Sequence, residues 1–496
     1  MNISFVYYGR YQVRESLELE YLSAIAKRAG HNVTLVYDPG VFGVTDNVCY
    51  MPYLSKLFSR RLKVIEKIKR SQPDLILFSV YPSSYKWALD IADAVKIDIQ
   101  VPMVFIGLHA VLVPEKIMQN KSVDFVIQGE TEAVFLELID MISGSISLNN
   151  VGNLWYKDKG KVCMNSLKPL IDLDNLPLPD KSLFKEYIDV SDSYMIMASR
   201  GCMYACSYCE ETALRDVYGI NIYRKRTVES VINELTLMKK AYNFKEVLFK
   251  DAFFTQDIQW LKDFMREYKA FVQVPFKCFG KIQFVNEEKV KLLKDAGCYC
   301  VEFGLQSWNE DIRKKILNRF ETNEQARRVF QLCDTCRLWY DIDHIFGLPK
   351  ESISDHIIAA GEYARLTYLN RVKCHNLMYY PKMNILSHAK ADGIVTEEYI
   401  NQLDEGAEAD FFNTTRDTPR MQKINKDFRN LFKIINILPA CAVRFILHTK
   451  LYLLFRFIPG ILIVCAQIVG AWRSHDLRFK VYLKQYPLKI IRTFKS

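Results

Sequence analysis

Three cysteines in one short loop are the residues of this sequence best suited to chemistry. Cys202, Cys206 and Cys209 have the spacing C-x3-C-x2-C and directly follow an apolar, strand-like run. Clustered thiolates bind soft metals, and three ligands on one loop suit an iron–sulfur cluster that keeps one iron open to another ligand. A structural zinc ion needs a fourth ligand, and the residues that follow offer no nearby cysteine or histidine. A zinc loop completed by a distant residue, or three unrelated buried thiols, are the alternatives.

The chain has a globular composition with its charge surplus at one end. Its 496 residues are 50% hydrophobic and 25% charged, with a net charge of +10. Residues 420–496 contain 15 basic and 2 acidic residues, so the rest of the chain has a net charge of −3. This balance does not favour nucleic-acid binding by the main body. The length predicts about three domains.

The thirteen cysteines are expected to be free thiols or metal ligands. The N-terminus shows no signal-peptide pattern, so we expect a cytoplasmic protein in which disulfides do not form. Cys333 and Cys336 form a C-x2-C pair whose helical spacing predicts buried thiols on one face. Cys298 and Cys300 alternate on a predicted strand and are expected to share one face.

Residues 1–145 alternate strand-like and helix-like runs, which predicts an α/β domain with a doubly wound parallel sheet. In such sheets ligands bind beyond the carboxyl ends of the strands. Here those ends carry the segments 79–84, 107–110 and 128–132. Residues 146–190 are expected to form a linker that contains a small hairpin and then a Pro-punctuated stretch.

A second strand–helix series occupies residues 191–400. Six strand candidates separated by helical patterns predict a partial parallel barrel or an open sheet, with chemistry at the carboxyl ends of the strands. Residues 401–496 are expected to be a basic, hydrophobic, helical region. Its longest uncharged run, Phe457–Trp472, has 16 residues, just short of the roughly 17 to 25 that span a bilayer. This region could cover the barrel mouth, lie at a membrane surface or bind a partner.

The cysteine loop, with Tyr208 before the third cysteine, resembles the signature of the radical S-adenosylmethionine (SAM) superfamily. The resemblance implies a TIM-like partial β/α barrel and a [4Fe–4S] cluster held by Cys202, Cys206 and Cys209. In this superfamily the open iron binds SAM, and one-electron reduction cleaves SAM to a 5′-deoxyadenosyl radical. An electron donor such as flavodoxin or ferredoxin is therefore an expected partner.

Other positions of the same region match weaker motifs of this superfamily. The resemblance assigns Asp251 to the neighbourhood of the methionine moiety. It places Gln306 and Ser307 at the fourth-strand motif, and Gly347 and Pro349 at the fifth-strand motif beside the adenine. Ordinary turn chemistry at strand ends is the alternative for these residues.

The N-terminal domain resembles the Rossmann-like cobalamin-binding domain that is fused to many radical SAM enzymes. The matching stretches are IGLHAVLVPE and VDFVIQGETEAVFLELI, and the connector NLPLPDKSLF also fits. The residues assigned to cobalamin binding are Ser79, Gly107, His109, Gly129 and Glu130. Gly107 follows Ile106 where the group often has a second glycine. The cobalt-binding motif D-x-H-x-x-G is missing from this domain, and DIDHIFG, which holds His344 and Gly347, lies in the barrel and lacks the required Asp.

These resemblances imply a cobalamin-dependent radical SAM enzyme with a small-molecule or lipid-like substrate. The favoured reaction is methyl transfer to an unactivated carbon, in which the 5′-deoxyadenosyl radical abstracts a hydrogen atom and methylcobalamin delivers the methyl group. One alternative is a non-methylating radical reaction, such as an oxidative cyclisation or a lipid or natural-product tailoring step. Another is a non-catalytic cobalamin or metal sensor, which the three-cysteine loop argues against. The basic tail adds an expected peripheral membrane contact.

Overall fold

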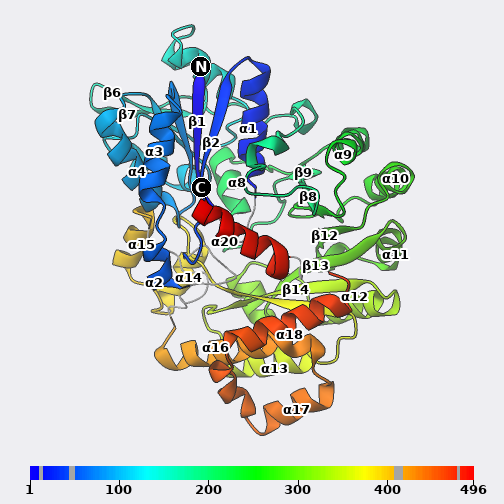
Figure 1. Ribbon diagram of the computed structural model, residues 1–496. Coiled ribbons are helices and arrows are strands. Elements are labelled where there is room, and N and C mark those ends of the chain that lie inside the picture. The colour runs from blue at the N-terminus through cyan, green and yellow to red at the C-terminus, as the bar shows by residue number, and fades with distance from the viewer. Residues whose placement is uncertain (10–14, 44–50, 407–416, 477–480, 496) are drawn as a thin grey trace.

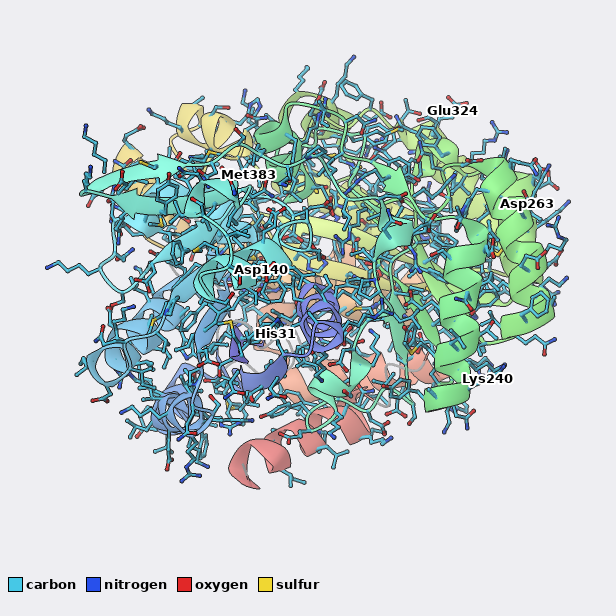
Figure 2. All side chains as sticks on the ribbon, turned by 90° about the horizontal axis from the view of Figure 1, so that it is seen from above. His31, Asp140, Lys240, Asp263, Glu324 and Met383 are labelled. Carbon is cyan, nitrogen blue, oxygen red and sulfur yellow. The ribbon has the colours of Figure 1, made fainter. Side chains whose placement is uncertain are left out.

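The computed structural model describes residues 1–9, 15–43, 51–406, 417–476 and 481–495, with the side chains of all but a few of them. Two α/β domains lie side by side, and a set of helices follows them (Figure 1). Figure 2 shows the same arrangement from above: His31 and Asp140 lie on the first domain, and Lys240 and Asp263 lie on the outer helices of the second.

The first domain is built on a seven-stranded sheet in the order β2-β1-β3-β4-β5-β6-β7. Its strands are β1 (Asn2–Tyr8), β2 (Asn32–Asp38), β3 (Leu75–Ser79), β4 (Met103–Ile106), β5 (Phe125–Ile127), β6 (Leu154–Asp158) and β7 (Lys161–Met164). The first five are parallel, whereas β6 and β7 form an antiparallel hairpin at the edge. The predicted hairpin is thus confirmed, and it extends this sheet.

Helices cover both faces of this sheet. They are α1 (Leu17–Arg28), α2 (Pro52–Leu57), α3 (Arg61–Arg70), α4 (Tyr85–Asp98), α5 (Leu108–Leu112), α6 (Pro114–Met118) and α7 (Phe135–Ile142). Because side chains alternate along a strand, Leu75 and Leu77 of β3 face one apolar core while Ile76 and Phe78 face the other. Such a sheet, buried on both faces, confirms the doubly wound architecture.

The second domain contains a six-stranded parallel sheet in the order β15-β14-β13-β12-β11-β8. The strands are β8 (Tyr194–Ile196), β11 (Val247–Phe249), β12 (Phe276–Gly280), β13 (Cys298–Gln306), β14 (Trp339–Phe346) and β15 (Leu369–Asn376); β9 (Ser199–Arg200) and β10 (Arg224–Lys225) form a separate two-stranded ladder. The structure therefore confirms a partial β/α barrel with six strands.

Helices between these strands form the outer layer of the barrel. They are α9 (Val228–Tyr242), α10 (Ile258–Glu267), α11 (Glu287–Asp295), α12 (Asn323–Thr335) and α13 (Ile353–Tyr363). By contrast, α8 (Glu211–Tyr218), α14 (Ile385–Ala391) and α15 (Glu397–Asp404) pack in a core that they share with α5 of the first domain. Local sequence fixes several of their first turns. Thr322 and Gln325 form a capping box on α12, and Ser352 and Asp355 form one on α13, which satisfies backbone N–H groups that have no helical partner.

The expectation that Cys298 and Cys300 share a strand face is wrong. Cys298 packs in the helix-side core with Val301, whereas Cys300 lies on the other face, where its Sγ is 3.7 Å from Asn370 Nδ2. The register between β12 and β13 shifts at this point, and such an irregularity changes the side-chain alternation. Cys333 is buried in the core of the barrel, as its helical spacing predicts, and Cys336 packs against that core.

The C-terminal residues form α16 (Pro419–Ile434), α17 (Ala440–His448), α18 (Gly460–Arg473) and α20 (Tyr486–Lys495). Phe428 and Phe432 of α16 are fully buried in the same core as Phe346 of β14. Because these residues pack on the outer, helix-covered face of the sheet, α16 extends the outer layer of the barrel rather than covering its mouth. The helices α16, α17 and α18 lie together beyond α13 (Figure 1).

Among the described helices, none has both the length and the apolar composition to cross a membrane alone. The 3-10 segment Leu451–Phe457 and helix α18 meet that test only as a pair, and they are bent by 107° relative to each other.

Candidate active site

The cysteine loop connects β9 to α8 at the carboxyl edge of the barrel sheet. Backbone and side-chain contacts anchor it to the segment after β13: the Ser207 hydroxyl donates to the Ile316 carbonyl at 2.6 Å, and the Asn318 amide donates to the Ala205 carbonyl at 2.7 Å. Cys206 is buried, while Cys202 and Cys209 are half-buried. The loop therefore has a fixed position from which its thiols can reach a bound group.

The electrostatics of this loop suit a cationic group. Burial raises the pKa of the Cys202 thiol, and burial together with the Glu211 carboxylate raises the pKa of the Cys209 thiol well above its ordinary value. A bound metal reverses this preference because it stabilises thiolates.

Arg319 is a cation that contacts this loop at Cys206 and Tyr208. Its Nη1 lies 3.8 Å from Cys206 Sγ and 3.4 Å from Tyr208 Oη, and its Nε donates to Glu321 Oε1 at 2.6 Å. Nearby Lys281 is buried, and desolvation together with the Arg319 charge lowers its pKa to about 8. No sequence motif marks either residue, because both approach the loop from other parts of the chain.

The strand-end residues assigned from the sequence lie at the carboxyl ends of β11, β13 and β14. The Asp251 carboxylate is buried and accepts from Ser199 Oγ at 2.6 Å and Ala198 N at 3.1 Å, and burial raises its pKa to about 6. Gln306 has a φ of +70°, and its Oε1 is buried without a hydrogen-bond partner. Ser307 accepts from Asn309 N at 3.2 Å and so caps the next turn.

The fifth-strand turn also has the geometry that its sequence predicts. Gly347 has a φ of +79°, a conformation that favours glycine. Its N–H donates to Glu351 Oε2 at 2.7 Å, so this carboxylate closes the turn that contains Pro349. The glycine, the proline and the glutamate thus act together as one backbone motif.

A cavity of about 260 Å³ lies between the carboxyl edge of the first sheet and the cysteine loop. The first domain contributes Gly107, Gly129 and Glu130, and the second contributes Gly201 and Glu211. A Cβ on Gly107 would lie 2.8 Å from the Val80 carbonyl oxygen, and a Cβ on Gly129 would lie 2.5 Å from Tyr218 Oη. Both glycines also have positive φ. The backbone conformation at this edge therefore requires glycine at both positions.

Glu130 pairs with two arginines of the second domain. Arg224 Nη1 lies 2.9 Å from Glu130 Oε2, and Arg200 Nη1 lies 3.4 Å from Glu130 Oε1. Burial alone would raise the pKa of this carboxyl group, but the two guanidinium groups hold it below its ordinary value. Glu130 therefore joins the two domains beside the cavity that it lines.

Ser79 and His109 lie outside the lining of this cavity. Ser79 Oγ donates to Glu18 Oε2 at 3.0 Å, and it is Glu18 that reaches the cavity. Burial and the nearby Glu132 charge raise the pKa of Glu18 to about 7. His109 is fully buried with its ring centroid 4.4 Å from that of Tyr85, and burial lowers its pKa to about 3. The neutral imidazole is thus a core residue under the edge of the sheet.

Comparison with known families agrees with this architecture. The model of the B12 binding domain matches residues 10–139, and the model of the radical SAM superfamily matches residues 196–360. The chain belongs to the cobalamin-binding radical SAM enzymes. Its cofactors are cobalamin, a [4Fe–4S] cluster and SAM.

Two curated relatives are named as methyltransferases. The uncharacterized methyltransferase PH0819 of Pyrococcus horikoshii is 27% identical over 335 residues, which cover 66% of this chain and 72% of the relative. The cytidylyl-2-hydroxyethylphosphonate methyltransferase of Streptomyces wedmorensis is 22% identical over 375 residues, which cover 67% of this chain and 69% of that protein.

Two solved structures share the fold. The radical SAM methyltransferase TsrM from Kitasatospora setae, with cobalamin and a [4Fe–4S] cluster bound, has a TM-score of 0.59 at 15% identity and covers 77% of this chain and 76% of its own. The cobalamin-dependent radical SAM enzyme OxsB with aqua-cobalamin bound has a TM-score of 0.65 at 15% identity. It covers all of this chain and 84% of its own.

Replacing Cys206 tests the assignment of the cysteine loop. The variant Cys206→Ala should lose the roughly four iron atoms per chain that a single four-iron cluster requires, because two thiolates cannot hold the cluster. Iron and sulfide are counted after anaerobic reconstitution. Cys441→Ser, at an exposed cysteine of α17, is the matched control and should keep its iron. Unchanged iron in Cys206→Ala would show that the loop does not bind the cluster.

Proposed function

We propose that this enzyme transfers a methyl group to an unactivated carbon of a small-molecule substrate. The observation that carries the proposal is the shared cavity, because one partly open space is lined by the edge of the first sheet that we assign to cobalamin and by residues flanking the cysteine loop. The names of the two methyltransferase relatives support the same reaction. A reaction that uses both cofactors on one substrate requires such a common space.

In this proposal Cys202, Cys206 and Cys209 hold the cluster. The burial of Cys206, the half-buried positions of Cys202 and Cys209 and the spacing of the three thiols on one loop fit ligands of bound iron. Gly107 and Gly129 hold this edge in positive-φ turns in which Val80 and Tyr218 occupy the space that a Cβ would need, and we assign the contact with the flat cofactor to these turns. When bound, cobalamin and SAM would supply a methyl group and an organic radical, with the cluster as electron source.

The chain's own contribution is to exclude water and to hold protons. Leu17, Leu108, Val111 and Leu214 give the cavity an apolar wall, which limits the quenching of reactive species by solvent. Burial raises the pKa of Glu211 to about 7, so its carboxyl group can hold a proton near neutral pH. Arg200 lines the same cavity, and its positive charge pairs with the carboxylate of Glu132.

A non-methylating radical reaction is the second candidate. It is supported by a curated relative named 4'-phospho-dehydrooxetanocin synthase, from Priestia megaterium, which is 24% identical over 180 residues. The two candidates share the cofactors and the cavity, and they differ in whether the methyl group of SAM reaches the product.

Isotope labelling separates these candidates. Reconstituted protein with cobalamin, a reductant and methyl-labelled SAM is incubated anaerobically with cell extract as the source of substrate. Methyl transfer predicts label in a new product together with 5′-deoxyadenosine, and both should disappear in Cys206→Ala. The Cys441→Ser control should behave as the parent enzyme does. Formation of 5′-deoxyadenosine without transfer of label would contradict methyl transfer and favour the second candidate.

We also propose that a small reducing protein such as flavodoxin or ferredoxin supplies the electrons, since each methyl transfer would need one electron to cleave SAM and a second to return cobalamin to the state that SAM remethylates, and no resident group provides them. Arg319, whose Nη1 lies 3.8 Å from Cys206 Sγ, is a suitable cation for stabilising the reduced cluster.

A peripheral membrane contact through the C-terminal helices is a further part of the proposal. Large apolar side chains are exposed in this basic region. They belong to Phe445, Leu454, Phe457, Ile461, Leu462 and Trp472. Exposed apolar area together with positive charge favours binding to anionic lipid. We therefore propose a cytoplasmic enzyme that also contacts a membrane surface through these exposed apolar residues.

Vesicle binding tests this contact without removing any helix. Phe457→Ser combined with Trp472→Ser should reduce cosedimentation with vesicles of anionic phospholipid several-fold, because both side chains are more than 70% exposed. Phe271→Ser, at an exposed aromatic residue of the barrel, is the control. Equal binding of all three proteins, or no binding by the parent, would contradict the membrane contact.

A further inference from the structure

We propose that His344, Glu351 and His356 form a second metal site, for a zinc-type divalent ion. The three residues come from the end of β14, the turn that follows it and helix α13. One donor atom from each lies within 4.8 Å of the other two. The site lies in the core between the barrel sheet and its outer helices, because the ring of His344 packs 5.0 Å from Phe432 of α16. None of the three residues lines the cavity described above.

Each of the three side chains has one buried donor atom without a partner. These atoms are His344 Nε2, His356 Nδ1 and Glu351 Oε1. The side chains are 3% exposed or less, so bulk water does not reach them. Buried polar atoms nearly always have a hydrogen-bond partner. Three neighbouring side chains thus keep unused donor capacity for a ligand, and two of them already approach each other, with His356 Nε2 3.7 Å from Glu351 Oε2.

The second polar atom of each side chain makes a hydrogen bond to a neighbouring residue, as is usual for metal-binding side chains. His356 Nε2 lies 2.9 Å from Asn425 Oδ1, and the amide of Asn425 in turn donates to Asp417 Oδ2 at 2.8 Å. Because an amide oxygen only accepts, His356 carries its proton on Nε2 and presents the lone pair of Nδ1. Such outer hydrogen bonds fix the tautomer of a metal-binding histidine.

His344 and Glu351 follow the same pattern. His344 Nδ1 lies 2.9 Å from Tyr363 Oη, so donation to the phenol oxygen leaves the lone pair of Nε2 for a metal. Glu351 Oε2 accepts from Gly347 N at 2.7 Å, which leaves Oε1 available.

Two imidazoles and one carboxylate are a common donor set for zinc. Bonds of about 2.0–2.2 Å would draw the donor atoms slightly closer together, and a water molecule would complete four-coordination. The bound ion would join the Gly347 turn to α13 and, through Asn425, to α16. Its role is therefore structural: it fixes the fifth-strand turn and anchors the C-terminal helices to the barrel.

The metal content of the intact enzyme tests this site. Protein produced with zinc, reconstituted anaerobically and desalted, should contain about one zinc per chain in addition to its iron. His356→Gln should lose the zinc and keep the iron, whereas Cys206→Ala should lose the iron and keep the zinc. His448→Gln, at an exposed histidine of α17, is the control for histidine replacement. This pattern separates the new site from adventitious zinc on the cysteine loop.

X-ray absorption at the zinc edge of the parent enzyme makes the test independent of variant folding. The proposal expects only nitrogen and oxygen ligands, near about 2.0–2.2 Å. Sulfur ligands near about 2.3 Å, or parent protein without stoichiometric zinc, would overturn it. A failure of this proposal leaves the iron count and the methyl-transfer assay unchanged, so it is distinguishable from a failure of the proposed function.

Discussion

The buried ion pairs between Glu130 and the arginines Arg200 and Arg224 determine how the two domains meet. Glu130 follows the positive-φ turn at Gly129, and Arg200 directly precedes the cysteine loop. A carboxylate buried at this depth requires cationic partners, because an uncompensated buried charge costs several kcal/mol. The edge of the first sheet is therefore fixed against the strand that leads into the cluster loop.

A second buried charge strengthens the same junction. Lys181, in the connector, is fully buried and donates to Glu20 of α1 at 2.8 Å and to the Met195 carbonyl of β8 at 3.0 Å. One side chain thus contacts both domains. The cavity between the two domains follows from these contacts, and it explains how two cofactors on separate sheets can act on one substrate.

The periodic features of the fold could be predicted from the sequence, because strands and helices carry their own patterns. The alternation in residues 1–145, the six barrel strands and the C-x3-C-x2-C loop are local signals of this kind. Glu130 was predicted at the cofactor edge, but its pairing with Arg200 and Arg224 could not be, since those partners are 70 and 94 residues away. The bulge that separates Cys298 from Cys300 and the packing of α16 on the outer barrel face also arise only in the folded chain. The cluster of His344, Glu351 and His356 is equally invisible in the sequence, because one strand, one turn and one helix bring these residues together.

The central claim is that cobalamin and the cluster face one chamber, the cavity between the two domains, and electron paramagnetic resonance tests it most directly. The enzyme is loaded with cob(II)alamin, and its cluster is reduced in the presence of SAM, so that both centres are paramagnetic. Our account predicts dipolar broadening of both signals relative to samples that contain one paramagnetic centre at a time. Two unbroadened signals that simply add together would show that the cofactors do not share this chamber, and would contradict the account.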